Sequence, residues 1–285
     1  LPSIEELKKK VKDFADNLME LKETPMIEEY YTGPVLFEGG AASRLFTDNL
    51  LSPGRLLALR TMAPARGMLD EQLGRRIIDS RLTVKNYTTL AEYNGTPLFG
   101  CYEIDGDGVV PAAELTLVEN GVFKRMLNGR VPTLKAPEST GSARFMISPD
   151  NPMAIVSPGT IHVQASKGVG PEKLKKALLK AAKEADLEYA YIVRRIGGEA
   201  SAVYKVNVKD GKEIRVRVNN LSAPELTKLM DLKGISSDER VMNYFPNGVP
   251  ASLIYPSAII VGDVEINRTT PKIEEEPVLK HPLQR

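Results

Sequence analysis

A strand pattern passes directly into a helix pattern near the start of the chain, and this junction constrains the fold more than any other segment. Residues 30–36 combine aromatic and β-branched side chains, which are enriched in strands. Residues 38–51 carry Leu45 and Phe46 on one apolar side, which predicts a helix. Small residues fill the turn between them. Because the backbone N–H groups at a helix start are unpaired, we expect functional groups to gather at this point.

Turn-forming dipeptides divide much of the remaining chain into short strand-like runs. Asn120-Gly121 and Asp210-Gly211 each separate two such runs, and Asn-Gly adopts the positive φ angles of a tight hairpin turn. Strand patterns are at residues 30–36, 81–87, 96–104, 113–119, 122–127, 153–164, 189–196, 202–208, 213–218, 251–254 and 258–266, and helix patterns at 171–185 and 224–232. The prediction is an α+β fold of β-rich mixed or antiparallel sheets, barrel-like or sandwich-like, with a few flanking helices.

The first 24 residues are predicted to form one amphipathic helix. Ser3 and Glu6 have the spacing of a capping box. Apolar residues follow at spacings of three and four, namely Ile4, Leu7, Val11, Phe14, Leu18 and Leu21. A single helix cannot bury such a stripe, so we expect it to pack on the rest of the chain or on a preceding segment. The predicted division is this helix (1–24), as the end of a missing half, and one domain (25–285).

Charge and cysteine content narrow the classes of function. The net charge is +1 without a dominant basic stripe, so no direct nucleic-acid contact is expected, because phosphate neutralisation supplies most of that affinity. The single cysteine, Cys101, excludes an intramolecular disulfide framework. No apolar run of about 18 residues predicts a membrane span. A cytoplasmic location is favoured, and export stays open because the chain does not begin with Met.

Four stretches carry a likeness to a known family. They are YYTGPVLFEGGAASRLF (30–46), DGDGVVPAAELTLVENGVFKRMLNGRVP (105–132), STGSARF (139–145) and VPASLIYPSAIIVGDVEINR (249–268). In this order they resemble the TldD/PmbA family, the "modulator of DNA gyrase" or TldD/TldE peptidase group. The resemblance extends over residues 30–285 and implies the C-terminal half of a family member.

The resemblance also implies where a catalytic metal would lie. Catalytic members carry HExxxH and a late Cys, whose two His and Cys hold zinc while the Glu acts as general base. Here Glu38 stands at the Glu position, but Phe37 and Ala42 stand at the two His positions, and residues 219–266 contain no Cys. The likeness is therefore to the non-catalytic TldE/PmbA-like branch. It implies no cofactor in this chain and zinc only in a catalytic partner.

The function implied by this resemblance is that of a non-catalytic subunit. It would support peptide proteolysis by a TldD-like partner within a homo- or hetero-oligomer. Two alternatives stay open, a divergent hydrolase that uses Glu38, Cys101 or Arg144, and a scaffold that binds peptide without a catalytic partner. Within the motif, Glu38 is the residual candidate for catalysis. Its simpler interpretation is a first-turn Glu that the helix dipole favours.

The loop at residues 139–144 is the predicted substrate contact. Ser139, Thr140 and Gly141 are small enough to allow a peptide backbone to approach closely, and Arg144 supplies a bidentate donor for a carboxylate. The alternative is a flexible surface loop.

Other polar residues have simpler structural interpretations. Cys101 lies in an apolar stretch and is expected to be a buried thiol. His162 is alone on a predicted strand and is interpreted as a structural histidine, whereas His281 is expected to be solvated. Asp105 and Asp107 are spaced like the start of a calcium loop, but the Glu at the twelfth position is missing, so a plain turn is predicted.

Overall fold

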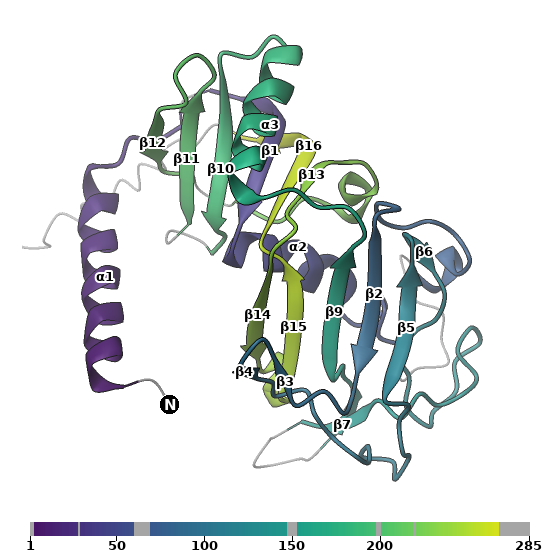
Figure 1. The fold of residues 1–285 in the computed structure, drawn as a ribbon. Coiled ribbons are helices and arrows are strands. Elements are labelled where there is room, and N and C mark those ends of the chain that lie inside the picture. The colour runs from purple at the N-terminus through teal and green to yellow at the C-terminus, as the bar shows by residue number, and fades with distance from the viewer. Residues whose placement is uncertain are drawn as a thin grey trace, which may run out of the picture.

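The computed structural model describes residues 3–27, 29–59, 69–146, 153–197, 201–218 and 221–267. Within these ranges the chain forms two six-stranded sheets and three α-helices (Figure 1). Each sheet contains one parallel strand pair among antiparallel pairs, so both are mixed. The predicted α+β class is confirmed. In the described part of the chain neither sheet closes into a barrel.

The first sheet is built around β1, its fourth strand. Its order is β12 (Glu213–Val216), β11 (Ala202–Asn207), β10 (Tyr189–Arg195), β1 (Tyr31–Glu38), β16 (Ala258–Ile266) and β13 (Leu232–Ile235). Both faces of β1 are buried. Val35 and Phe37 belong to the main core, whereas Leu36 packs with Leu174 and Leu178 of α3 (Pro171–Glu184). An amphipathic helix thus covers one face of this sheet.

The second sheet has the order β14 (Glu239–Tyr244), β15 (Ala251–Pro256), β9 (Thr160–Ala165), β2 (Leu82–Tyr87), β5 (Glu114–Glu119) and β6 (Val122–Phe123). Two small hairpins accompany it, β3 (Glu92–Tyr93) with β4 (Thr96–Pro97), and β7 (Ala143–Phe145) with β8 (Ala154–Val156). Among the described residues, the 3₁₀ helices are η1 (Leu69–Gln72), η3 (Leu226–Met230) and η4 (Pro246–Gly248).

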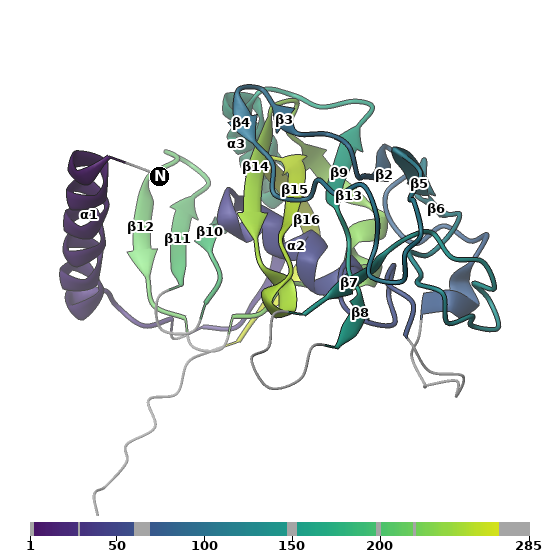
Figure 2. The ribbon, with the colours of Figure 1, turned by 90° about the horizontal axis from the view of Figure 1, so that it is seen from below.

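The chain crosses from the second sheet to the first at one residue, Ser257, which separates β15 from β16. β13 and β14 make the same crossing in the opposite direction, and the Ser257 N–H donates to the Asp238 carbonyl (2.9 Å) between them. The helix α2 (Gly40–Leu50) lies against this crossing and contacts β1, β10 and β15 (Figure 2). Its Leu45 and Phe46 are buried in the core that both sheets share. This packing places the start of α2 where the sheets meet.

The predicted N-terminal helix is confirmed as α1 (Ile4–Glu23). The Ser3 Oγ accepts from the Glu6 N–H (3.2 Å) and the Glu6 carboxylate accepts from the Ser3 N–H (2.8 Å), which is a complete capping box. α1 stands beside β12 at the edge of the first sheet (Figure 1). Among the described residues, no helix is both long and apolar enough to cross a membrane.

Several predicted element boundaries were wrong. β1 continues to Glu38 and α2 begins only at Gly40, because Gly39 has φ 55° and breaks the strand. The predicted strand 96–104 is reduced to Thr96–Pro97, and the helix 224–232 is the 3₁₀ helix η3. The strands β13 and β14 were not predicted. Gly234 disfavours a strand in β13, yet a Cβ there would lie 2.8 Å from Leu174, so close packing against α3 requires glycine.

Candidate functional site

The junction of β1 and α2 is fixed by backbone hydrogen bonds around Gly39. The Gly39 N–H donates to the Ser257 carbonyl (2.8 Å), and the Gly39 carbonyl accepts from the Ser43 N–H (3.2 Å). Gly39 adopts φ 55° and ψ −122°, a combination open to glycine but strained for other residues. The strand end, the sheet crossing and the helix start therefore meet at one point.

Phe37 and Ala42 stand at the two positions that the family resemblance assigns to metal ligands, and both are fully buried. Phe37 is on β1 and Ala42 is on the first turn of α2, yet both belong to the core cluster that links the sheets. Neither side chain has an atom that binds a metal. Both positions that HExxxH implies for the His ligands thus lie in the same apolar core, and apolar side chains fill them.

Glu38 lies on the opposite face of β1 from Phe37. Its Oε2 accepts from the Arg194 Nε at 3.0 Å, and the Arg194 Nη2 also donates to Glu213 (2.9 Å). Lys175 of α3 donates to the other Glu213 oxygen (2.6 Å). Burial would raise the pKa of Glu213, but Lys175 and Arg194 lower it below its ordinary value. The first-turn interpretation of Glu38 was wrong, since this residue ends β1 and joins an ion-pair network.

The donors at this junction do not fit zinc. A zinc site needs three or four Cys, His or carboxylate ligands around one point. Over the ranges that the structure describes, no group of three or more His, Cys, Asp or Glu side chains is placed to hold a metal ion. At the junction, Phe37 and Ala42 contribute no donor and Glu38 is bonded to Arg194.

His162 is satisfied inside the fold, as predicted. It lies on β9 with only 6% of its surface exposed, and its Nε2 is 3.0 Å from the Glu239 Oε1. Tyr93 of β3 donates to the other Glu239 oxygen. Burial would raise the pKa of Glu239, but the bonds from His162 and Tyr93 lower it. This network joins the small hairpin β3–β4 to the second sheet. His281 lies outside the described residues.

Cys101 is exposed, so the prediction of a buried thiol was wrong. The surrounding residues do not form a strand, and Gly100 packs directly on the backbone of Gly159. A Cβ on Gly100 would lie 2.3 Å from the Gly159 carbonyl carbon. Leu98 is buried while Phe99 is 44% exposed, so the apolar stretch does not enter the core as a unit.

Asp105 organises the backbone next to the predicted substrate loop. Its Oδ1 accepts from the N–H groups of Asp107 (2.9 Å) and Val109 (2.8 Å), and its Oδ2 accepts from the Ala143 N–H (3.0 Å). These bonds close a turn and tie it to β7. The interpretation of this segment as a plain turn is confirmed.

The predicted substrate loop is held by hydrogen bonds to neighbouring segments. The Thr140 hydroxyl accepts from the Asn128 N–H (2.7 Å), and Tyr102 donates to the Gly141 carbonyl (2.9 Å). The Arg144 guanidinium stacks on Tyr102 (4.1 Å to the ring centre) and donates to the carbonyls of Pro158 and Pro250. Burial lowers the pKa of Arg144. The guanidinium is therefore already engaged with main-chain carbonyls.

Part of this loop borders a cavity of about 400 Å³. Ser139 and Thr140 line it together with Lys124, Lys135 and Glu138. Arg144 is not in its lining. The structure thus separates Arg144 from the two hydroxyl residues with which the sequence grouped it.

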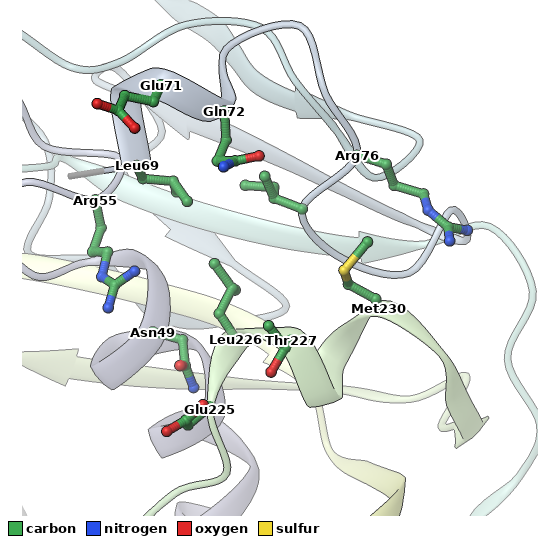
Figure 3. A pocket seen from close by; sticks show the side chains of 11 residues that line it. Asn49, Arg55, Leu69, Glu71, Gln72, Arg76, Glu225, Leu226, Thr227 and Met230 are labelled. Carbon is green, nitrogen blue, oxygen red and sulfur yellow. The ribbon is translucent and has the colours of Figure 1, made fainter. Parts of the chain in front are cut away.

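A second cavity, of about 560 Å³, lies between the end of α2, η1 and η3 (Figure 3). We call it the η1–η3 cavity. It is lined by Asn49, Arg55, Leu69, Glu71, Gln72, Arg76, Ile77, Glu225, Leu226, Thr227 and Met230. Its charged members have both signs, and none makes an ion pair with another described residue. Figure 3 shows the Arg55 guanidinium pointing toward Asn49.

Asn49 connects α2 to this cavity. Its Nδ2 donates to the Leu45 carbonyl (2.9 Å) and to the Pro224 carbonyl (2.8 Å). The amide orientation is thereby fixed, and the Oδ1 is left as an acceptor. A cavity with a fixed acceptor, charges of both signs and an apolar wall suits a ligand that has charged ends and an apolar middle. Sequence reasoning missed this site because its residues come from three separate segments.

The comparisons with known proteins fit this fold. A family model described as the PmbA/TldA metallopeptidase C-terminal domain matches residues 30–267. The chain belongs to the PmbA/TldA family. The predicted TldD/PmbA resemblance is confirmed, and the matched range contains both sheets but not α1. No curated protein sequence matches this PmbA/TldA chain.

Two solved structures share the fold of this PmbA/TldA chain. TldE from Thermococcus kodakarensis superposes with a TM-score of 0.55 at 17% identity, over 84% of this chain and 51% of that one. A candidate modulator of DNA gyrase from Bacteroides thetaiotaomicron superposes with a TM-score of 0.51 at 13% identity, over 88% of this chain and 51% of that one. The chain thus spans about half the length of both.

Proposed function

We propose that this chain is a non-catalytic PmbA/TldA-family domain that supports peptide proteolysis by a metal-bearing relative. The burial of Phe37 and Ala42 in the shared core carries the proposal. A metal ligand at either position would need a polar side chain in apolar surroundings. Glu38, the remaining residue of the motif, lies on the other face of β1 and pairs with Arg194.

In this proposal the chain forms part of the wall of the cavity that holds the peptide, and it contacts the substrate directly. The η1–η3 cavity contacts the substrate through Arg55 and Glu225, which have no ion-pair partner among the described residues. Ser139 and Thr140 contact it at the second cavity. Gly141 and Arg144 hold that loop in place. The chain acts in the cytoplasm in a homo- or hetero-oligomer of family subunits, with zinc only in the catalytic partner.

A peptide-binding scaffold is the second candidate function. The η1–η3 cavity favours it, because its charges of both signs have no ion-pair partner among the described residues and could bind peptide without a catalytic subunit. Binding of peptide by this chain alone, with no effect on proteolysis by any family member that carries HExxxH, would distinguish the scaffold from the supporting subunit.

Metal analysis of the purified protein tests the proposal directly. The protein is incubated with zinc and dialysed exhaustively. Its zinc content is then measured by inductively coupled plasma mass spectrometry. We expect far less than one zinc per chain and no peptidase activity from the chain alone. Stoichiometric zinc that survives dialysis, together with peptidase activity, would overturn the proposal. The supporting role is measured as an increase in peptide cleavage when this chain is added to an HExxxH-bearing relative.

A further inference from the structure

The cavity of about 400 Å³ beside the predicted substrate loop is lined by residues of the segment 73–140 alone. We call it the loop cavity. Its wall is formed by β5, by the residues that follow β6 and by the loop at residues 135–140. β5 and β6 lie at the opposite side of the molecule from α1 (Figure 1, Figure 2). The loop cavity is therefore built entirely by the part of the chain that the family model matches.

One wall of the loop cavity is held in place by Asn128, which is fully buried. The Asn128 N–H donates to the Thr140 hydroxyl (2.7 Å), and its Nδ2 donates to the Ala136 carbonyl (2.6 Å). The Asn128 carbonyl accepts from the N–H groups of Thr140 (3.1 Å) and Ser142 (3.2 Å). These bonds fix the loop without a ligand. A site that is formed in advance loses little conformational freedom when a ligand binds.

Positive charge exceeds negative charge in the lining of the loop cavity. Three cations and one carboxylate line it, namely Lys124, Arg125, Lys135 and Glu138. Lys124 pairs with Glu119 outside the lining at 3.3 Å. Arg125 and Lys135 have no ion-pair partner among the described residues. The η1–η3 cavity, in contrast, contains two arginines and two glutamates. The loop cavity is therefore suited to a ligand with negative charge.

The rest of the lining is mostly apolar. It includes Leu115 of β5, the buried Met126 and Val110, which is 73% exposed. Ser139 adds a hydroxyl, whose oxygen accepts from the Gly141 N–H at 3.1 Å. The hydrogen of this hydroxyl is left to donate to a ligand. A ligand that matches the lining therefore combines a carboxylate with an apolar group beside it.

Two other kinds of anion fit this lining less well. Inorganic phosphate would leave the apolar side chains without a contact, and a volume of about 400 Å³ is in the range of cavities that hold larger organic ligands. Single-stranded nucleic acid stacks its bases on aromatic side chains, and the residues that line the loop cavity include no aromatic one. The lining thus favours an organic acid with an apolar part.

We propose that the loop cavity binds an acidic segment of a peptide, in which Glu or Asp lies next to a large apolar residue. Arg125 and Lys135 bind the carboxylates, and the Ser139 hydroxyl donates a further hydrogen bond. Leu115 and Met126 contact the apolar side chain. The peptide nature of the ligand rests on the proposed function, whereas its negative charge rests on the lining alone.

Three short peptides test the proposal, and both ends of each are blocked so that no end charge reaches the η1–η3 cavity. One contains Glu-Leu-Glu, the second Gln-Leu-Gln and the third Lys-Leu-Lys, within the same neutral flanks. Binding to the purified chain is followed by fluorescence anisotropy of the labelled peptide. We expect the Glu peptide to bind about tenfold more tightly than the Gln peptide, because charge-assisted hydrogen bonds are the stronger ones. The Lys peptide should bind least, and high salt should reduce the preference.

Substitutions in the lining show whether the preference arises in the loop cavity. Arg125→Gln/Lys135→Gln should reduce the difference between the Glu and Gln peptides to less than about twofold. The melting temperature should not fall, because both residues are exposed. Glu138→Gln removes a repelling charge and should tighten binding of the Glu peptide by about threefold. The matched control Lys167→Gln/Arg195→Gln makes the same change in net charge at exposed positions outside the lining and should leave the preference as it was.

Three outcomes would overturn the proposal. The first is equal affinity of the parent protein for the Glu and Gln peptides. The second is an equal loss of preference in the control variant, which would assign the attraction to net charge. The third is displacement of the Glu peptide by inorganic phosphate or succinate at equal concentration, which would assign the cavity to a small anion. All three are measured on this chain alone. A failure of the chain to increase cleavage by an HExxxH-bearing relative would instead contradict the proposed function and leave the measured preference unaffected.

Discussion

Phe37 and Glu38 are consecutive residues of β1, and their side chains lie on opposite faces of the first sheet. Phe37 packs in the core that both sheets share, while Glu38 pairs with Arg194 at 3.0 Å. Successive side chains of a strand alternate between faces. The alternation therefore places the Glu38 side chain on the face opposite Phe37, away from the core cluster that contains both Phe37 and Ala42. A metal ligand and a base at these two positions would point apart in this backbone.

The first prediction concerns Glu38 as a structural residue. Glu38→Gln removes one half-exposed ion pair with Arg194, so we expect a loss of less than about 1 kcal/mol in urea unfolding. Glu213→Gln, which affects the pairs with both Arg194 and Lys175, should cost more. Peptide cleavage supported by the chain should not change in the Glu38 variant. Abolished cleavage with unchanged stability would restore Glu38 as a catalytic residue.

The second prediction uses the adjacent glycines Gly39 and Gly40 as a matched pair. Gly39 has φ 55°, and a Cβ there would lie 3.0 Å from the Arg240 guanidinium. We expect Gly39→Ala to lower the free energy of unfolding by about 2 kcal/mol through backbone strain. Gly40 starts α2, and a Cβ there meets ordinary contact at 3.9 Å. Gly40→Ala should therefore be neutral or stabilise by up to about 1 kcal/mol.

Thermal and urea unfolding of both variants measure this difference. Equal effects at the two positions would mean that the conformation of Gly39 is not required for the junction.

Asp79 ties the two sheets together and is the basis of a third prediction, on pH. Its Oδ2 accepts from the Leu232 N–H of β13 (2.9 Å) and from the Arg81 guanidinium (2.8 Å), just before β2. Burial would raise the pKa of Asp79, but the bonds from the Arg81 side chain and backbone and from Leu232 lower it to about 2. The carboxylate therefore stabilises the fold only while it is charged.

The direction of this pH dependence follows from the pKa of Asp79, which is lower in the folded state than the value of about 3.9 in the unfolded state. The stabilisation is fully present above about pH 5 and is lost progressively as the pH falls from about 5 toward 1, through the folded-state pKa of about 2. Its size at neutral pH is about 2 kcal/mol. Asp79→Asn should remove this amount at pH 7, measured by urea unfolding, and the gap to the parent protein should narrow as the pH falls and close only below about pH 2. Asp231→Asn, on an 82% exposed side chain, is the control and should cost little.

Local patterns in the sequence were sufficient for the fold class and the main strands. The Asn120-Gly121 hairpin forms between β5 and β6, and the capping box at Ser3 starts α1 as predicted. The sequence also identified the β1–α2 junction, because a strand and a helix there are close neighbours. The exact boundary between this strand and this helix was missed. Gly39 ends the strand through its positive φ and through its hydrogen bond to the Ser257 carbonyl, and Ser257 lies 218 positions later in the chain (257 − 39).

Other features depend on contacts between distant segments and leave no local pattern. β13 contains Gly234 because α3 packs against it, so local propensity argues against the strand that forms. Arg144 carries the side chain of a substrate contact, but Tyr102 and two main-chain carbonyls occupy it. The η1–η3 cavity combines Arg55 with Glu225, which only the folded chain brings together.

The last prediction tests that cavity as a peptide site. Arg55→Gln and Glu225→Gln each remove a charge that has no ion-pair partner among the described residues, so neither should lower the melting temperature by more than about 2 °C. Each should weaken binding of an unstructured peptide with free termini by about tenfold, because a charge-assisted hydrogen bond is lost. Fluorescence anisotropy with a labelled peptide measures both affinities.

Peptides with blocked ends show which charged residue of the cavity binds which end of the peptide. A carboxyl-terminal amide should reduce binding to the parent protein but not further reduce binding to Arg55→Gln, since the same interaction is already missing. An acetylated amino terminus should behave in the same way toward Glu225→Gln. Arg130→Gln changes an exposed arginine outside the lining and is the control for net charge. If Arg130→Gln weakens binding as much as Arg55→Gln, the attraction is a general effect of net charge, and the η1–η3 cavity is not the peptide site.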